Sequence, residues 1–235
     1  SEPCRDPLMP APLSVIIPTL NAGDELPACL AALMPGAEGG LVREVIIADG
    51  GSEDATPAIA DSAGADVIEG PAGRAKQLIS GASRARGDWL LFLHADTVLS
   101  RDWAERVRDH IADRPGKAAV FTLAFRSDHP MASRVARRAN QRARFLALPY
   151  GDQGLLISRK LYDETGGYED LPLLEDVRLV QAVGRKRLSI LSAQARTSAA
   201  KYERDGWRRR SWKNAWIITR YLLGASPASL ARSYR

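Results

Sequence analysis

The 235-residue chain has few of the residues on which several common protein classes depend. Its two cysteines, Cys4 and Cys29, are not in a Cys-x-x-Cys spacing. We therefore expect no disulfide framework and no cysteine-based zinc site, and we predict two free thiols in a reducing cytosol. The three histidines, His94, His110 and His129, lack metalloprotease spacing. No stretch of about 18 apolar residues is present, so no membrane span is predicted.

The chain also lacks the short motifs that mark three large enzyme classes. No Gly-x-Gly-x-x-Gly follows the first apolar run, which disfavours a dinucleotide oxidoreductase. No Gly-x-x-x-x-Gly-Lys-Ser/Thr is present, which disfavours a P-loop kinase. No Gly-x-Ser-x-Gly is present, which disfavours a serine hydrolase. The chemistry of the chain must therefore be sought in other residues.

Positive charge, by contrast, is present in excess and is unevenly distributed. The chain has 33 Lys and Arg against 28 Asp and Glu, a net charge of +5. Counted along the chain, the net charge is −7 in residues 1–125, +5 in 126–144, −1 in 145–195 and +8 in 196–235. Charged residues at 26% and hydrophobic residues at 45% are ordinary values for a globular chain with a core. The asymmetry is therefore the feature that needs an explanation.

Short apolar runs alternate with helical segments through the first half of the chain. Strands are predicted at 13–18, 45–48, 66–69 and 89–93, and helices at 24–33, 56–63, 73–85 and 100–112, with Ser100 as an N-cap. Further strands are predicted at 120–125 and 154–158, and further helices at 131–148, 174–183, 207–223 and 227–231. Helical crossovers join parallel strands, so this pattern predicts an α/β, Rossmann-like, mostly parallel sheet flanked by helices.

Polar residues follow the predicted strands where such sheets bind ligands. Asp49 lies where these folds place a ribose-binding acid. His94 and Asp96 follow the fourth strand, and on an extended backbone residues two apart point the same way. An imidazole and a carboxylate together can hold Mg²⁺ or Mn²⁺ beside phosphate oxygens. The alternative is that His94 is an ordinary histidine at the end of a strand.

Two further polar pairs have both a functional and a structural interpretation. Glu175 and Asp176 begin a predicted helix, where acids favour the helix dipole, but one of them is also a candidate general base. Asp152 and Gln153 lie between glycines, before a predicted strand. That position suits a tight loop that presents both side chains to a ligand, or an ordinary turn in which Asp is favoured.

Six segments form a set whose order and spacing are specific. They are residues 14–21, 45–54, 73–77, 87–97, 151–154 and 166–176. As a set they resemble glycosyltransferase family 2, which implies a GT-A fold over about residues 13–190. The His-Ala-Asp-Thr segment and the Gly-Asp-Gln-Gly loop resemble a bacterial subgroup of the arsenosugar-biosynthesis type.

The resemblance implies a metal-dependent inverting glycosyltransferase that moves a sugar from a nucleotide-sugar, expected to be a UDP-sugar, to a hydroxyl acceptor. Asp176 matches the catalytic base. Asp96 matches the last acid of the family's motif for Mg²⁺ or Mn²⁺, and His94 replaces its first Asp. The resemblance also implies roles for Pro18, Thr19, Asn21, Asp49, Arg74 and Lys76 at the nucleotide and for Asp152, Gln153 and Glu175 at the donor or acceptor sugar.

Some positions depart from the family pattern. Ile79 stands where an Asn is expected, and no histidine follows His129 to serve as a late metal ligand. A non-catalytic sugar-nucleotide-binding protein of the same fold is therefore the alternative function. A nucleotidyltransferase is a weaker rival, because its Gly-x-Gly-Thr-Arg opening is absent.

The resemblance and the charge pattern together divide the chain. Residues 1–12 are predicted to be a flexible lead-in without the apolar core of a signal peptide. Residues 13–195 form the transferase domain, with a nucleotide-binding half at 13–125 and an acceptor half at 126–195. Residues 196–235 are a basic amphipathic helical extension.

The basic extension carries aromatic residues among its arginines. Trp207, Trp212, Trp216 and Tyr221 are the aromatics of its main helix. A helix of this composition over residues 196–223 can lie on an anionic membrane surface, which would suit a lipid-linked acceptor. The alternatives are a solvated helix that packs its aromatics onto the domain, and a homodimer contact. No nucleic-acid-binding motif accompanies the charge, so nucleic acid is not an expected partner. The expected location is the cytoplasm, with peripheral attachment to the inner membrane as an alternative.

Overall fold

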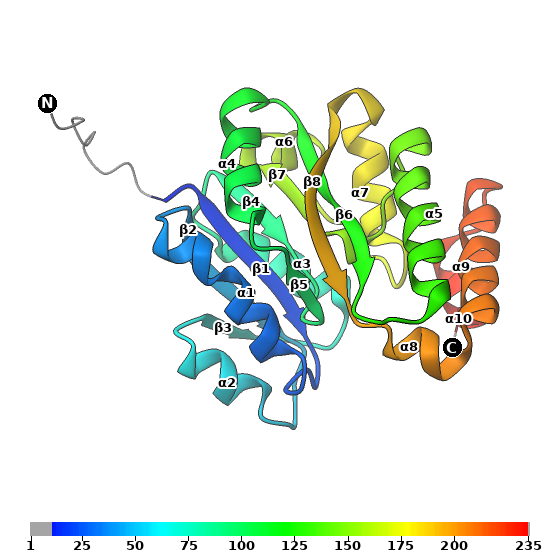
Figure 1. The fold of residues 1–235 in the computed structure, drawn as a ribbon, viewed down its shortest axis with the longest axis horizontal. Helices are drawn as coiled ribbons and strands as arrows, with labels where there is room; N and C mark the ends of the chain where they lie inside the picture. The colour runs from blue at the N-terminus through cyan, green and yellow to red at the C-terminus, as the bar shows by residue number, and fades with distance from the viewer. Residues whose placement is uncertain (1–10, 235) are drawn as a thin grey trace, which may run out of the picture.

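The computed structural model describes residues 11–234, in which eight strands form one sheet (Figure 1). The strands are β1 Leu13–Thr19, β2 Val42–Asp49, β3 Asp66–Glu69, β4 Trp89–Phe92, β5 Thr97–Leu99, β6 Ala118–Phe125, β7 Leu155–Ser158 and β8 Leu188–Thr197. Their order is β3-β2-β1-β4-β7-β6-β8-β5. Pairs among β3, β2, β1 and β4 are parallel, as is β6 with β8, and the pairs made by β7 and β5 are antiparallel. The predicted α/β fold with a mostly parallel sheet is confirmed.

Helices flank this sheet and extend beyond it. They are α1 Leu26–Glu38, α2 Thr56–Ser62, α3 Arg74–Arg84, α4 Trp103–Asp113, α5 Pro130–Leu146, α6 Arg159–Glu164, α7 Glu175–Val183, α8 Ala200–Asp205, α9 Trp207–Leu222 and α10 Pro227–Tyr234, with 3-10 turns η1 Gly151–Gln153 and η2 Arg185–Arg187. The prediction that Ser100 caps α4 is wrong. Asp102 occupies the N-cap position, and the Ser100 hydroxyl donates to Asp102 Oδ1 at 2.6 Å. Cys4 and most of the lead-in predicted at 1–12 lie outside the described residues.

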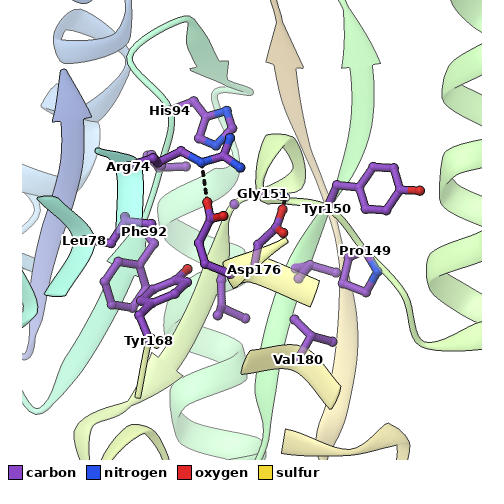
Figure 2. A pocket seen from close by; sticks show the side chains of 15 residues that line it. Arg74, Leu78, Phe92, His94, Pro149, Tyr150, Gly151, Tyr168, Asp176 and Val180 are labelled. Atoms are coloured by element: carbon purple, nitrogen blue, oxygen red, sulfur yellow. Dashed lines mark hydrogen bonds and ion pairs between the residues drawn. The ribbon is translucent and has the colours of Figure 1, made fainter. Parts of the chain in front are cut away.

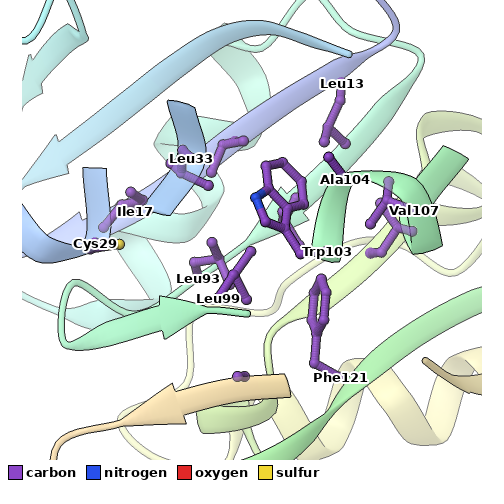
Figure 3. Close-up of a cluster of buried hydrophobic side chains, with 14 of the residues drawn as sticks. Leu13, Ile17, Cys29, Leu33, Leu93, Leu99, Trp103, Ala104, Val107 and Phe121 are labelled. Atoms are coloured by element: carbon purple, nitrogen blue, oxygen red, sulfur yellow. The ribbon is translucent and has the colours of Figure 1, made fainter. Parts of the chain in front are cut away.

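The alternation of side chains along β1 builds two cores, one on each face of the sheet. Val15 and Ile17 point toward the α1 and α4 side, where the fully buried Trp103 donates its indole N–H to the carbonyl of Ala32 (Figure 3). Ile16 points the other way, toward α3 and α7. Gly81 allows α3 to approach closely, since a Cβ there would lie 2.4 Å from Ile16 Cγ2. Cys29 is a buried free thiol, as predicted, and burial followed by the charge of Asp96 raises its pKa to about 12.

The second half of the chain adds β6, β7 and β8 beside β4. Strand β8 is the longest strand described and was not predicted from the sequence. Its inward positions include Ser189, Ala193, Ala195 and Thr197, which are too small or too polar to give an apolar alternation. The strand runs past residue 195, so the sheet continues across the predicted start of the extension.

Helix α9 packs beside α5, and α8 and α10 pack against α9 (Figure 1). Trp207 joins a cluster with alanines on the inner face of α5. Ile217 and Ile218 pack with Leu148 and with Val177 of α7. Between residues 11 and 234, the structure contains no helix with the length and apolarity needed to cross a membrane.

Candidate active site

The loop after β2 is organised around the carboxylate of Asp49. Its Oδ1 accepts from Thr19 Oγ1 at 2.7 Å and Ser52 Oγ at 2.5 Å, and its Oδ2 accepts from the N–H groups of Gly51 at 3.0 Å and Ser52 at 2.7 Å. Burial opposes the charge, but the hydrogen bonds outweigh it and hold the pKa of Asp49 below its ordinary value. A carboxylate has about four acceptor sites, so Asp49 is saturated by Thr19 at the end of β1 together with Gly51 and Ser52 of its own loop.

The loop after β1 is tied to the same structure. Asn21, which has a positive φ of 51°, accepts from the N–H of Glu53 through Oδ1 at 2.9 Å, and its own N–H donates to Ser52 Oγ at 2.8 Å. Gln77 of α3 donates its amide Nε2 to the carbonyls of Thr19 at 2.5 Å and Ala48 at 2.8 Å. These bonds hold the carboxyl ends of β1 and β2 in one arrangement.

A small hollow lies next to these strand ends, between β4, α3 and α7 (Figure 2). Its volume is about 20 Å³, room for about one water molecule, so a nucleotide-sugar would have to lie across its mouth. Arg74, at the start of α3, forms an ion pair with Glu175, at the start of α7. The Glu175 side chain is 2% exposed and that of Arg74 is 41% exposed. Burial opposes the charge of Arg74, but Glu175 and Asp176 outweigh it and raise its pKa.

Asp176, His94 and Gly151 meet at this hollow (Figure 2). Asp176 accepts from the N–H of Gly151 through Oδ2 and from the N–H of Val177 through Oδ1. A Cβ at Gly151 would lie 2.9 Å from His94 Nε2 and 3.1 Å from Asp176 Oδ2, so glycine is needed for this close approach. Burial, followed by the charge of Arg74, lowers the pKa of His94 to about 3, which makes the imidazole neutral at pH 7.

Asp152, in the next position of the same turn, has an unusual environment for an acid. Its Oδ1 is buried and has no hydrogen-bond partner among the described residues. Burial raises its pKa to about 6, against the opposing charge of Arg142, and the charges of Asp176 and Asp96 add to the rise. The charges of Asp176 and Asp96 therefore disfavour the ionised form of Asp152.

Asp96 lies beyond the end of β4, in a turn rather than an extended strand. The N–H of Thr97 donates to the carbonyl of His94 at 3.1 Å, which closes the turn. The assumption of an extended backbone here is therefore wrong, and the two side chains have different neighbours. Asp96 Oδ1 accepts from Thr197 Oγ1 at 3.1 Å, whereas the His94 ring faces Gly151 and Asp176.

Three of the predicted site residues do not line the hollow. Gln153 is fully buried, and its amide Nε2 donates to the carbonyl of Phe121 at 3.0 Å, toward β6. Lys76 is exposed on α3. Pro18 is half-buried in β1, in register with Ala48 of β2. Most of the other predicted residues form two neighbouring groups. One group contains Arg74, Glu175, Asp176 and His94, and the other contains Thr19, Asn21 and Asp49.

The site also uses residues that the sequence analysis did not assign. Gln77 joins two strand ends, as described above. Arg142 lies over the ring of Tyr150, with its guanidinium carbon 3.5 Å from the ring centroid. Tyr168 lines the hollow, and burial followed by the charge of Asp176 raises its pKa well above the ordinary value. No periodicity in the sequence marks these three residues, and Gln77 acts on carbonyls 58 and 29 residues away along the chain.

The sheet and its flanking helices form a GT-A glycosyltransferase fold, which the similar solved structures share. The family model described as glycosyl transferase family 2 matches residues 14–168. The chain therefore belongs to glycosyltransferase family 2.

Curated relatives match part of this chain. A PGL/p-HBAD biosynthesis glycosyltransferase of Mycobacterium bovis is 36% identical over 122 residues, which is 48% of this chain and 47% of that protein. The protein of the same description from Mycobacterium tuberculosis matches equally. The chain thus spans about half the length of the curated relatives that it matches.

Solved structures match more of the chain at lower identity. S. aureus TarS 1–349 has a TM-score of 0.61 at 16% identity, over 79% of this chain and 60% of that chain. Glucosyl-3-phosphoglycerate synthase from Mycobacterium tuberculosis, in complex with Mn²⁺, UDP and glucosyl-3-phosphoglycerate, has a TM-score of 0.59 at 20% identity, over 78% of this chain and 70% of that chain. At these identities the likeness concerns the fold.

Proposed function

We propose that this chain is an inverting glycosyltransferase that moves a sugar from a UDP-sugar to a hydroxyl acceptor with the help of a divalent metal. The observation that carries the proposal is the meeting of Asp176, His94 and the Arg74–Glu175 ion pair at the carboxyl end of the parallel strands. Family membership and the neighbour with UDP and Mn²⁺ support it.

The donor is assigned to the loops after β1 and β2. Pro18 and Asn21 are the accessible residues of the proposed nucleotide surface. Thr19 and Asp49 are buried and hydrogen-bonded to each other, and this bracing gives the surface a fixed shape before the nucleotide arrives. Arg74 is half-exposed and remains charged, so it can meet the diphosphate while Glu175 holds it in place. Lys76 lies two residues further along α3 and adds positive charge.

Asp176 is assigned as the general base. It accepts two backbone hydrogen bonds, which fix its orientation and leave acceptor capacity on a carboxylate with about four sites. As the acceptor oxygen forms its bond to the anomeric carbon, the bond from that carbon to the diphosphate oxygen breaks with its electron pair. The acceptor proton passes to Asp176. One in-line displacement of this kind inverts the anomeric centre.

The donor set fits a hard divalent cation that shares its ligands with a substrate. Among residues 11–234, no cluster of three or more His, Cys, Asp or Glu side chains could hold a metal alone. Magnesium sites commonly use one or two carboxylates plus substrate phosphates. Asp96 would hold the metal, and Oδ1 of Asp152, which has no partner among the described residues, is a further oxygen of the right chemistry. The His94 ring faces Gly151 and Asp176 rather than the neighbours of Asp96, so the geometry does not favour His94 as the second ligand. When bound, Mg²⁺ or Mn²⁺ would offset the negative charge of the departing diphosphate.

Calorimetric titration with UDP, with and without Mn²⁺, tests the donor and the metal together. We expect UDP binding that Mn²⁺ strengthens, and Asp96→Ala should remove the strengthening. Asp113→Ala, at the far end of α4, is the matched control. No UDP binding by the folded chain would overturn the donor assignment. Binding that is never followed by sugar transfer or donor hydrolysis would favour the non-catalytic sugar-nucleotide-binding alternative.

A further inference from the structure

Helix α9 has two apolar faces, and one of them is exposed. Trp207, Ile217 and Ile218 are buried against the domain. Trp212 and Trp216, one helical turn apart, are 76% and 64% exposed. The prediction that the helix packs its aromatics onto the domain therefore holds for Trp207 but not for these two. Exposed tryptophans on a helix that is already packed indicate a second contact.

More apolar side chains are exposed near the second half of α9. Leu148 packs against Ile217 and Ile218, which places the end of α5 beside this part of the helix. We define the aromatic patch as Phe145, Leu146, Trp212, Trp216, Leu222 and Leu223. Among the described residues, these are six of the eight large hydrophobic side chains that are exposed, and all six lie on α5, on α9 or directly after α9.

The helices that bear the patch carry positive charge only. Helix α5 contains five arginines and α9 contains four arginines and one lysine, and neither contains an Asp or Glu. Arg138 and Arg144 on α5 are exposed, as are Arg208 and Arg209 on α9. A partner of this surface must therefore offer negative charge around an apolar interior.

We infer that the aromatic patch docks the protein onto an anionic membrane surface. Exposed tryptophan and leucine side chains can enter the boundary between headgroups and acyl chains, while flanking arginines contact anionic headgroups. A second copy of the chain is disfavoured as the occupant, because a symmetric contact would bring the exposed arginines of α5 and α9 up against those of the other copy. Nucleic acid would use the arginines but gives no role to Leu222 and Leu223.

The patch lies close in sequence and in space to the proposed active site. The chain continues from α5 through Leu148 to Pro149 and Tyr150, which line the hollow. Arg142 of α5 lies over the Tyr150 ring and donates to the carbonyl of Leu148 at 2.8 Å, which couples the end of the helix to this loop. Resting on the proposed transfer function, this arrangement points to an acceptor class: a hydroxyl carried by an amphiphile at the membrane surface.

Co-sedimentation with vesicles tests the docking surface. The probes are vesicles of phosphatidylcholine alone and of phosphatidylcholine mixed equally with phosphatidylglycerol. We expect the wild type to sediment with the anionic vesicles at low salt and to be released by high salt. Trp212→Ser/Trp216→Ser should bind at least about tenfold more weakly, and the matched control Met34→Ser, an exposed apolar residue on α1, should bind as the wild type.

Several outcomes would overturn the inference. These are absence of binding to anionic vesicles, equal binding by the double variant, and a dimer or a nucleic-acid complex that the double variant loses while no vesicle binding is seen. Circular dichroism checks that the variants are folded. UDP titration of the same proteins separates the two proposals: loss of vesicle binding with intact UDP binding concerns the patch, and sedimentation without UDP binding would count against the transfer function alone.

Discussion

The strand-end site and the aromatic patch differ in how their charged side chains are arranged. At the site, Arg74 is paired with a buried Glu175, and Asp49 is saturated by hydrogen bonds from Thr19 and from its own loop. On α5 and α9, basic residues stand at the surface without any acid on either helix, beside exposed tryptophans. Paired charge fixes a shape in advance, whereas displayed charge attracts a partner from solution.

The comparison also explains the charge asymmetry of the chain. The N-terminal half is acidic, yet its acids at the site serve to orient neighbouring groups rather than to attract an anionic donor. The attraction must come from Arg74, Lys76 and a metal. The excess positive charge lies beyond residue 125, on the helices that carry the patch, and is therefore separate from donor binding.

The largest expected effect is the loss of the base. Asp176→Asn keeps an acceptor of similar shape but cannot take a proton, so kcat should fall about 10³-fold while UDP binding is retained. Steady-state transfer measurements with a UDP-sugar check this, with Asp170→Asn, an exposed acid before the same helix, as the control. Full activity in Asp176→Asn would exclude it as the base.

The next effect concerns stability and is asymmetric across the Arg74–Glu175 pair. Arg74→Ala leaves the buried Glu175 carboxylate uncompensated and should cost about 3 kcal/mol. Glu175→Ala leaves Arg74 half-exposed, where water can solvate it, and should cost about 1 kcal/mol. Urea unfolding of both variants measures the difference. Equal losses of stability in the two variants would contradict the conclusion that Glu175 is buried while Arg74 is reached by water.

Gln77→Ala tests the bracing of the nucleotide loops. The substitution removes donors from the carbonyls of Thr19 and Ala48, and should cost about 2 kcal/mol of stability. Because those carbonyls end β1 and β2, UDP affinity should also fall. Gln141→Ala, on the exposed face of α5, is the control. A loss of stability without a loss of UDP affinity would show that the loops keep their shape without Gln77.

Much of the fold follows from the sequence, because its first half has strong apolar strands separated by clear helices. All the strands predicted there are present, including β3 at Asp66–Glu69. Strand β8 was not predicted because most of its inward positions hold small or polar residues, with Leu191 as the exception. Strand β5 was not predicted because it has only three residues. A strand that other elements bury needs no apolar pattern of its own.

The site was predictable where local motifs carry it and not where distant contacts do. The strand-end positions of Thr19, Asn21 and Asp49 follow from topology. The contact of Arg74 with Glu175 spans 101 residues. Each of the two was expected at a ligand, but no pattern in the sequence indicates that they pair. The separate directions of His94 and Asp96 depend on a turn that no pattern in the sequence marks.

Asp152 differs from the other acids of the site, because its Oδ1 has no hydrogen-bond partner in the part of the chain that the structure describes. Burial raises its pKa from 3.8 to about 6, so its ionised form is costly in the folded chain. Below pH 3.8 Asp152 is neutral in both the folded and the unfolded chain and costs no stability. As the pH rises from 3.8 through about 6, the free energy of unfolding falls, because the unfolded chain ionises this carboxyl more readily than the folded chain.

Asp152→Asn removes this loss of stability. In the absence of metal and nucleotide, the variant should therefore gain about 1 kcal/mol relative to the wild type between about pH 5 and about pH 8. Urea unfolding at both pH values measures the gain, and Asp170→Asn should show none. A gain that vanishes when Mn²⁺ and UDP are added to both proteins would show that the missing partner of Asp152 is the bound metal and nucleotide.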